Sequence, residues 1–313
     1  MATHKFSGVI PILATPFNDD ESLDIGSWQR TIEVMVGAAR VLAASSTFGW
    51  FKPAEFISLT DDQHSPYIDA ELGRSCICPI YCVHVTLPGM SLLVDASADV
   101  MKPGAPDTPV GVNQPPGVIA RLAEAGILPA DITHLVITHG HEDHVSGLTV
   151  VQDGKLVPQF PNARHYFGAA EWNDPHFQKV FADKQSSLAT TLGVVHDAGL
   201  LTLVIGDLEL GHGVTILAAP GETPGHQVVR VNSNRETLYC LGDLYHFEFE
   251  FSHPHIFAKW KLPEAVFATR TMMTKRVIDD HASMIVTHIP GLGQLDSTDN
   301  GVCWRSINTT RIL

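Results

Sequence analysis

The amino-acid sequence predicts a layered α/β protein with two mixed β-sheets. The chain has 313 residues, enough for one large domain with an extra segment or for two modest domains. Its hydrophobic fraction of 44% and charged fraction of 17% are close to globular averages. Strand and helix patterns alternate along the chain, with two blocks of consecutive strands among them, and this alternation favours sheets covered by helices.

The composition also narrows the range of partners. The formal net charge is −14, and no stripe of Lys and Arg follows any predicted element, so we expect no nucleic-acid partner. Every apolar run is too short to span a membrane, and the early stretch GVIPILATPF is a poor signal peptide because two prolines interrupt it. We therefore expect a soluble protein without a membrane partner.

The five cysteines favour the cytoplasm. Their number is odd, and their spacing does not match a small disulfide framework. Three of them, Cys76, Cys78 and Cys82, lie in the apolar stretch CICPIYCVHV. A metal site there is the alternative interpretation, but cysteine in such a strand usually acts as a small buried hydrophobe.

The N-terminal part has its own character. Residues 6–38 predict a short strand, a polar turn and a helix from about Ser27. This stretch, with GVIP and TPF, resembles the start of the dihydrodipicolinate synthase family, a (β/α)8 barrel. One strand and one helix cannot close a barrel core, so the resemblance implies no aldolase activity. We expect residues 1–75 to be an N-terminal extension, an aldolase-like fragment plus linker, before a main domain at 76–313.

The main domain begins with a predicted hairpin at 76–95, which turns at Pro88 and Gly89. A Pro/Gly-rich loop at 102–117 and a helix closed by Gly126 follow, and then a short strand at 134–138. Residues 164–173 suggest a strand and a helix start, and 174–195 are largely helical in pattern. Four later stretches read as strands: GVTILAAPG, HQVVRVNS, TLYCLGD and ASMIVTHIP.

The stretch THGHEDHVSG, residues 138–147, concentrates three of the 17 histidines in six positions. His139 and His141 are two residues apart, so on an extended segment their side chains leave on the same side. Asp143 and His144 follow, where a helix can begin. Two imidazoles can therefore point to one position, and an acid plus an imidazole to a second, which suits two metal ions rather than one.

Additional ligands must come from elsewhere, because each divalent ion needs about three or four protein ligands. Three loops at strand ends offer them: His226 in PGETPGHQ, Asp243 in CLGDLYH and His288 in IVTHIPGLG. Glycine accompanies each of these side chains, which lets the backbone approach a site closely. Taken alone, a histidine at a strand end is more often a hydrogen-bonded structural residue. We give that interpretation to His84, His134, His165, His196, His212 and His281.

Together, H-G-H-E-D-H, T-P-G-H, G-D and the final histidine resemble the metallo-β-lactamase superfamily over residues 76–305. The resemblance implies a four-layer αββα sandwich of two mixed β-sheets flanked by helices, here with an extra N-terminal segment. It also implies that His139, His141 and His226 hold a first metal ion. Asp143, His144 and His288 would hold a second, with Asp243 bridging both. Glu222 occupies a position where many members have a histidine that is not a ligand.

The resemblance implies a dinuclear hydrolase with two divalent ions, most simply zinc, although manganese, iron or cobalt would suit the same ligands. A pair of such ions lowers the pKa of a shared water towards about 7 and polarises a substrate carbonyl. The metal-bridging hydroxide would then attack that carbonyl.

The loop sequences resemble the lactonase and organophosphate-hydrolase branch, so we expect a small ester or lactone substrate, such as an N-acyl homoserine lactone, and a homodimer. An aspartate rather than a cysteine at the bridging position argues against penicillin hydrolysis. A phosphotriesterase or arylesterase of the methyl parathion hydrolase type and a glyoxalase II-like thioesterase remain alternatives. The non-enzymatic alternative is an inactive metal-binding scaffold.

Candidate catalytic residues are Asp143, Asp243 and Tyr245. Asp243 could accept the proton released on ring opening. Tyr245, two residues further on, could hydrogen-bond a substrate oxygen, although its spacing differs by one residue from the pattern in related lactonases. In LYHFEFEFSHPHIF, the phenylalanines Phe247, Phe249 and Phe251 form either an aromatic wall beside the metals or the core face of a strand.

Overall fold

Two seven-stranded sheets dominate the computed structural model, which describes residues 32–97, 117–298 and 301–307. The first sheet has the order β1-β2-β3-β4-β5-β8-β9 and the second β10-β11-β12-β13-β14-β15-β16, while β6 and β7 form a separate hairpin. The first nine strands are β1 (Ile32–Val36), β2 (Ala39–Phe51), β3 (Cys76–Leu87), β4 (Met90–Val94), β5 (His134–Val136), β6 (Thr149–Gln152), β7 (Lys155–Pro158), β8 (Arg164–Gly168) and β9 (Leu201–Val204). The others are β10 (Leu208–Gly211), β11 (Val214–Ala218), β12 (Gln227–Ser233), β13 (Glu236–Cys240), β14 (Ser283–Ile285), β15 (Gly293–Thr298) and β16 (Gly301–Ser306).

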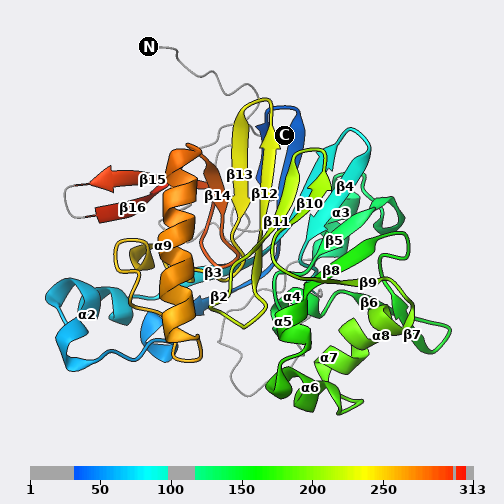
Figure 1. Cartoon of the computed structure of the whole chain (residues 1–313), viewed down its shortest axis with the longest axis horizontal. Coiled ribbons are helices and arrows are strands. Elements are labelled where there is room, and N and C mark those ends of the chain that lie inside the picture. The colour runs from blue at the N-terminus through cyan, green and yellow to red at the C-terminus, as the bar shows by residue number, and fades with distance from the viewer. Residues whose placement is uncertain (1–31, 98–116, 299–300, 308–313) are drawn as a thin grey trace, which may run out of the picture.

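The helices lie on the outer faces of these sheets and at their ends (Figure 1). They are α2 (Pro66–Gly73), α3 (Val118–Glu124), α4 (Glu142–Val145), α5 (Ala169–Trp172), α6 (Pro175–Phe181), α7 (Ser187–Thr190), α8 (Leu192–Asp197) and α9 (Pro263–Asp279). Short 3-10 turns cover Pro53–Glu55, Asp61–Gln63, Pro129–Asp131 and Glu248–Glu250.

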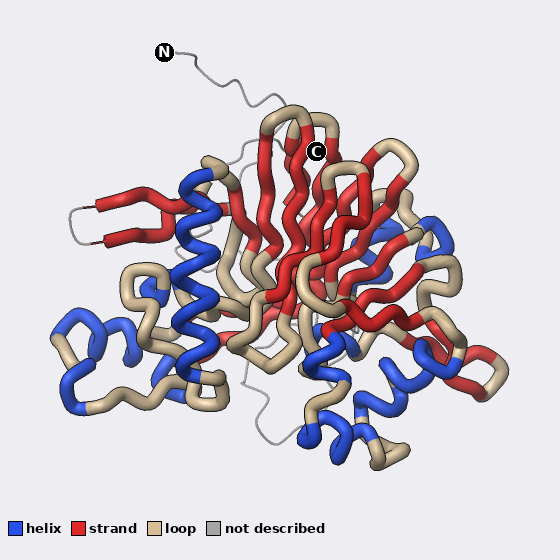
Figure 2. Tube along the Cα trace, in the orientation of Figure 1, coloured by secondary structure: helices blue, strands red, loops and turns tan. Residues whose placement is uncertain are grey.

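Both sheets are mixed. In the first, β4, β5, β8 and β9 pair in parallel and the remaining pairs are antiparallel. In the second, only β13 and β14 pair in parallel. The tube in Figure 2 shows the two sheets stacked against each other at the centre of the molecule.

Three hydrophobic clusters define the layers. Alternating valines fill the space between the sheets, with Val83 and Val85 of β3 in the same buried cluster as Val229 of β12. A second cluster packs α3, α7 and α8 on the outer face of the first sheet. A third packs Val266 and Met273 of α9 on the outer face of the second sheet. The predicted four-layer αββα sandwich of two mixed sheets is therefore confirmed.

The N-terminal segment differs from the sequence prediction. Residues 32–36 form the strand β1 instead of the predicted helix, because Val34 and Val36 alternate with less buried neighbours and face the core between the sheets. The following strand β2 pairs with β3 from Arg40↔Thr86 to Phe51↔Cys76, across the boundary expected at residue 75. Most of the aldolase-like stretch lies outside the described residues, and the division of the chain at residue 75 stays a prediction.

Several local predictions for the main domain are confirmed. The hairpin of β3 and β4 turns at Pro88 and Gly89, where a φ of 80° suits glycine. The helix α3 ends just before Gly126, which has a φ of 75°. Cys78 and Cys82 are buried within hydrophobic clusters, as the core interpretation of the cysteines predicts.

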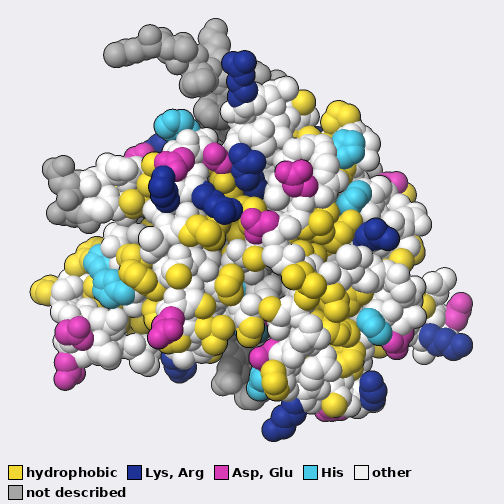
Figure 3. Space-filling view, in the orientation of Figure 1, with side chains coloured by type: hydrophobic (Ala, Val, Ile, Leu, Met, Phe, Trp, Pro, Cys, Tyr) yellow, Lys and Arg dark blue, Asp and Glu magenta, His cyan; other side chains and the backbone are white. Residues whose placement is uncertain are grey.

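The surface combines charged and hydrophobic side chains. Figure 3 shows both kinds distributed over one face, with hydrophobic side chains spread across its middle. No helix in the described ranges has both the length and the hydropathy that a membrane crossing requires.

Candidate metal centre

The histidine cluster follows the end of β5. This strand stops at Val136, and the chain then runs extended to His141, which occupies the residue position just before α4. His139 is 0% exposed, and its Nε2 lies 2.8 Å from Nδ1 of His141. The two imidazoles therefore converge on one position, as the spacing predicted.

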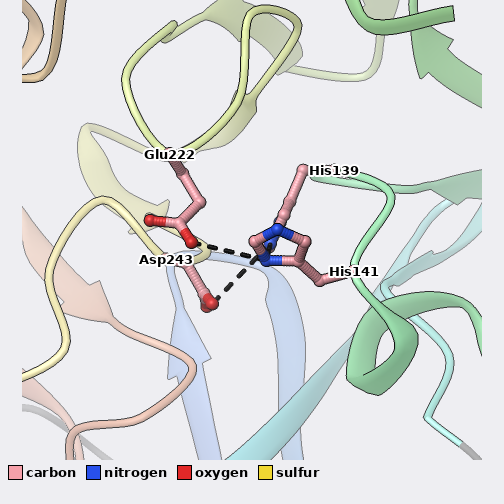
Figure 4. Close-up of side chains that lie close together, drawn as sticks. All are labelled: His139, His141, Glu222 and Asp243. Atoms are coloured by element: carbon pink, nitrogen blue, oxygen red, sulfur yellow. Dashed lines mark hydrogen bonds and ion pairs between the residues drawn. The ribbon is translucent and has the colours of Figure 1, made fainter. Parts of the chain in front are cut away.

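A first group of possible ligands forms around these imidazoles. His139, His141, Glu222 and Asp243 each offer one ligand atom, and these atoms lie within 4.8 Å of one another. Oδ2 of Asp243 is 3.7 Å from Nε2 of His139, and Oε1 of Glu222 is 3.4 Å from Nδ1 of His141. In Figure 4 the two acids point from one side towards the two histidines on the other.

A second group lies beside it. Asp143, His144, Asp243 and His288 also offer ligand atoms within 4.8 Å of one another. Nε2 of His144 is 3.2 Å from Oδ1 of Asp243, and Nε2 of His288 is 3.0 Å from Oδ2. Asp243 belongs to both groups, which is the arrangement expected of a bridging ligand.

The polar atoms at this junction fit metal ions. Within the described residues, Nε2 of His144 and Oδ1 of Asp243 are buried and make no hydrogen bond of good geometry. Buried polar atoms normally have such partners, and an ion between the two groups would supply one. Imidazole nitrogens with carboxylate oxygens are the ligands that zinc and similar divalent metals accept.

Hydrogen bonds from the surrounding fold orient three of the histidine rings. Nδ1 of His226 donates to the carbonyl of Ala219 at 3.0 Å, and Nδ1 of His288 donates to the carbonyl of Pro79 at 3.0 Å. Nδ1 of His144 lies 2.8 Å from Oδ2 of Asp95. A hydrogen bond at Nδ1 fixes the orientation of the ring and turns Nε2 away from that partner.

The acids and the burial shift the pKa values of these rings in opposite directions. Burial lowers the pKa of His226 to about 4, so this imidazole is neutral at pH 7. Burial also lowers the pKa of His288, but the charge and hydrogen bond of Asp243 outweigh it and raise that pKa to about 9. A proton on His288 thus balances the acids in the metal-free chain, and a bound cation would displace it.

His226 stands slightly apart from the first group. Its ring centroid is 5.3 Å from that of His139, and its Nε2 accepts a hydrogen bond of 3.2 Å from the backbone N–H of Asp243. Gly242 permits this close approach: its φ is 55°, and a Cβ there would lie 2.7 Å from Nε2 of His226. The structure therefore places the seven expected ligands close together at one end of the sandwich, and it adds Glu222 as an eighth side chain there.

Tyr245 lies outside this centre. It is 1% exposed, stacks on Phe251 at 3.9 Å, and its hydroxyl lies 3.0 Å from Oγ1 of Thr274 on α9. This position does not support a role for its hydroxyl on a substrate oxygen. The chain leaves β13 at Cys240 and turns, so the side chain two residues after Asp243 enters the core behind the site.

The phenylalanines after Tyr245 are also buried. Phe247 and Phe249 pack against residues 51–78, and Phe251 packs under α9. They lie in and on both sides of a 3-10 turn rather than in a strand, but the core interpretation describes them correctly. Two other aromatic rings contact residues of the centre: His246 stacks on His288, and the indole N–H of Trp260 donates to Glu222. Trp260 is edge-on to His246 at 5.7 Å and to Phe56 at 5.6 Å.

Four residues around the centre were not predicted from the sequence: Asp95, Glu171, His246 and Lys261. Asp95 follows the apolar strand β4 as Asp243 follows β13. An acid directly after an apolar strand is therefore the sequence signal that could have identified Asp95. Glu171 of α5 accepts hydrogen bonds from the N–H of Gly140 and the hydroxyl of Thr223. Lys261 donates to the carbonyl of Asp243 and pairs with Glu222, and only tertiary packing reveals this contact.

Comparison with known structures gives the same fold. A hydrolase of the beta-lactamase superfamily aligns over 89% of this chain and 97% of its own, with a TM-score of 0.70 and 20% identity. A dizinc quorum-quenching lactonase, solved with a product, aligns over 90% of this chain and 98% of its own, with a TM-score of 0.69 and 19% identity.

Sequence relatives match shorter stretches. A metallo-beta-lactamase domain-containing protein 1 from Xenopus laevis is 26% identical over 41% of this chain and 44% of its own. An N-acyl homoserine lactonase from Bacillus cereus is 22% identical over 40% of this chain and 42% of its own. The chain thus matches less than half the length of these curated relatives. The family model described as the metallo-beta-lactamase superfamily matches residues 78–261, which is more than half of the chain, and the protein therefore belongs to this superfamily.

Proposed function

We propose that the protein is a dinuclear metal-dependent hydrolase that opens a lactone ring, with an N-acyl homoserine lactone as the model substrate. The family and the site together support a metal-dependent hydrolase. One observation carries the dinuclear part of the proposal: Asp243 is shared by two ligand groups that lie side by side. The lactonase among the sequence relatives and the lactonase among the structural relatives support the substrate class.

The ligand groups assign a role to each side chain. His139, His141 and His226 would hold the first ion, and Asp143, His144 and His288 the second, with Asp243 between them. Zinc is the simplest choice, and manganese, iron or cobalt would fit the same donors. When bound, two such ions lower the pKa of a water to about 7 and polarise a substrate carbonyl.

The chain itself contributes positioning and exclusion of water. Asp243 is 2% exposed, and its backbone carbonyl accepts a hydrogen bond from Lys261, so the backbone that carries its carboxylate is held in place. We expect Asp243 to take up the proton released on ring opening. Trp260 is 41% exposed, and with Phe56 it offers an apolar surface for the acyl chain.

The ring of His246 completes the site. It stacks on His288 with centroids 5.2 Å apart, and its Nε2 lies 3.5 Å from Oδ2 of Asp243. It is the polar side chain that follows the bridging acid most closely on the metal side of the loop. We propose that His246, rather than Tyr245, acts beside Asp243 on the substrate.

A substrate panel with and without metal tests the proposal. The purified chain should bind about two equivalents of zinc and open acyl homoserine lactones, and a chelator should abolish turnover until zinc is returned. Turnover that survives complete metal removal would refute the mechanism. Faster hydrolysis of aryl phosphotriesters or thioesters would replace the substrate class only.

Metal analysis separates the enzyme from the non-enzymatic alternative. A chain that binds two ions but turns over none of these substrates would favour the metal-binding scaffold. A cytoplasmic location and a homodimer stay predictions, which fractionation of the source cells and light scattering would test.

A further inference from the structure

We propose that Glu222 is itself a ligand of the first metal ion. This inference rests on the dinuclear centre proposed above. Four ligand atoms, from His139, His141, Glu222 and Asp243, lie within 4.8 Å of one another. Around a tetrahedral ion with bonds near 2.1 Å, ligand atoms are about 3.4 Å apart. The distance from Oε1 of Glu222 to Nδ1 of His141 is 3.4 Å.

The carboxylate of Glu222 is held by two further side chains. The indole N–H of Trp260 donates to Oε1 at 2.6 Å, and Nζ of Lys261 pairs with Oε2 at 2.8 Å. A carboxylate oxygen has two lone pairs, so Oε1 can accept from Trp260 and still offer one to an ion. Carboxylates that bind metals are usually oriented by such outer hydrogen bonds.

The charge of Glu222 is buried together with that of Lys261. The side chains of Glu222 and Lys261 are both 0% exposed. An unpaired carboxylate in such a place would be strongly unfavourable, and Lys261 compensates it. Lys261 also donates to the carbonyl oxygens of Asp243 and Leu244, so one ammonium group connects Glu222 to the bridging acid.

The position of His226 leaves room for this ligand. Its Nε2 accepts from the N–H of Asp243 and is not among the four atoms of the first group. Glu222 therefore adds an oxygen donor and a negative charge to a site that the resemblance makes mainly imidazole. A harder, more anionic site favours manganese relative to a site of neutral imidazoles.

Metal binding to four versions of the full chain tests the assignment: the wild type, E222Q, K261M and the double variant E222Q/K261M. Zinc affinity at each site would be measured by competition with a chromophoric chelator, and Co²⁺ spectra would report the coordination of the first ion. Loss of an outer partner typically costs 10–100-fold in metal affinity. For E222Q we expect a loss at the first site of more than about 100-fold and a changed Co²⁺ spectrum.

The double variant separates a ligand from a structural ion pair. It removes both buried charges, so it should fold even if E222Q alone leaves Lys261 without its partner. If Glu222 is a ligand, E222Q/K261M should bind the first ion as weakly as E222Q does. Recovery of wild-type affinity in the double variant would overturn the inference, as would wild-type affinity and spectrum in E222Q. A wild-type chain that binds no metal would overturn the proposed function, and this inference with it.

Discussion

At the scale of single residues, we expect the neighbours His246 and Tyr245 to differ in their contribution to catalysis. His246 borders Asp243 and His288, whereas the hydroxyl of Tyr245 is bonded to Thr274 in the core. Phenylalanine at position 246 keeps a ring to stack on His288 but removes both nitrogens. We expect H246F to retain two metal ions and to lose about 10²-fold in kcat, the usual effect of removing a proton-transferring group.

Tyr245→Phe is the matched control, because it removes one hydroxyl one residue away. We expect it to leave kcat unchanged and to lower the free energy of unfolding by about 1 kcal/mol, the net contribution of one hydrogen bond. Steady-state kinetics with an acyl homoserine lactone and metal analysis of both variants give the answer. Loss of activity in Y245F together with normal activity in H246F would reverse the assignment.

Residue patterns in the sequence predicted the ligands better than their supports. Three ligands lie at the same end of neighbouring strands in the second sheet: His226, Asp243 and His288. Each is next to a strand that the sequence predicts, so their order along the chain was enough to identify them. Asp95 and Glu171 hydrogen-bond residues 138, 140 and 144 of the cluster from 31 to 49 residues away in sequence. Their contacts depend on how strands and helices pack, which no local pattern contains.

At the scale of elements, α5 clamps two ligand loops together. Oε1 of Glu171 accepts from the N–H of Gly140, between His139 and His141, and Oε2 accepts from the hydroxyl of Thr223 in the loop before His226. We expect Glu171→Ala to lower zinc affinity by about 10–100-fold, because both loops lose their shared anchor. Chelator competition on the purified variant measures this loss.

Glu171→Gln provides the comparison. Burial raises the pKa of Glu171 to about 7, so the neutral carboxyl is already populated near pH 7, and an amide of the same shape can still accept from Gly140. We expect E171Q to bind zinc within a few-fold of the wild type. Equal losses in the two variants would show that the charge, and not the hydrogen bonds, matters.

The strands and helices that the sequence predicted in the main domain are found, whereas the long helix α9 and the strand β2 were not predicted. One predicted element was wrong, and the error has a physical cause. The stretch IEVMV follows a helix-like pattern when read with residues 27–31, yet residues 32–36 form β1. Its partner β2 offers a paired edge, and burial of Val34 and Val36 between the sheets outweighs local propensity. The predicted hairpin at 76–95 needed no distant partner, and it is found where expected.

At the scale of the whole molecule, the candidate metal centre lies where loops of the two sheets meet. His139, His141, Asp143 and His144 follow β5 of the first sheet, whereas His226, Asp243 and His288 border β12, β13 and β14 of the second. These loops meet near α4, at the lower end of the strands in Figure 1. Bound ions would therefore link the two halves of the sandwich and stabilise the fold by mass action.

The place of residues 32–75 in this architecture leads to a final prediction. Val34, Val36, Val41 and Leu42 are each at most 4% exposed, and together they contribute about 6 to 12 kcal/mol by burial. That is comparable to the entire stability of a typical domain, about 5 to 15 kcal/mol. We expect a fragment of residues 76–313 to be unable to fold cooperatively or bind two ions, because its strand β3 would lose its partner β2.

Circular dichroism, thermal unfolding and zinc titration of the fragment 76–313 test this expectation. A variant that lacks only residues 1–31 keeps β1 and β2, and it separates their contribution from that of the preceding residues. A well-folded fragment with wild-type zinc binding would establish residues 1–75 as a separable extension instead.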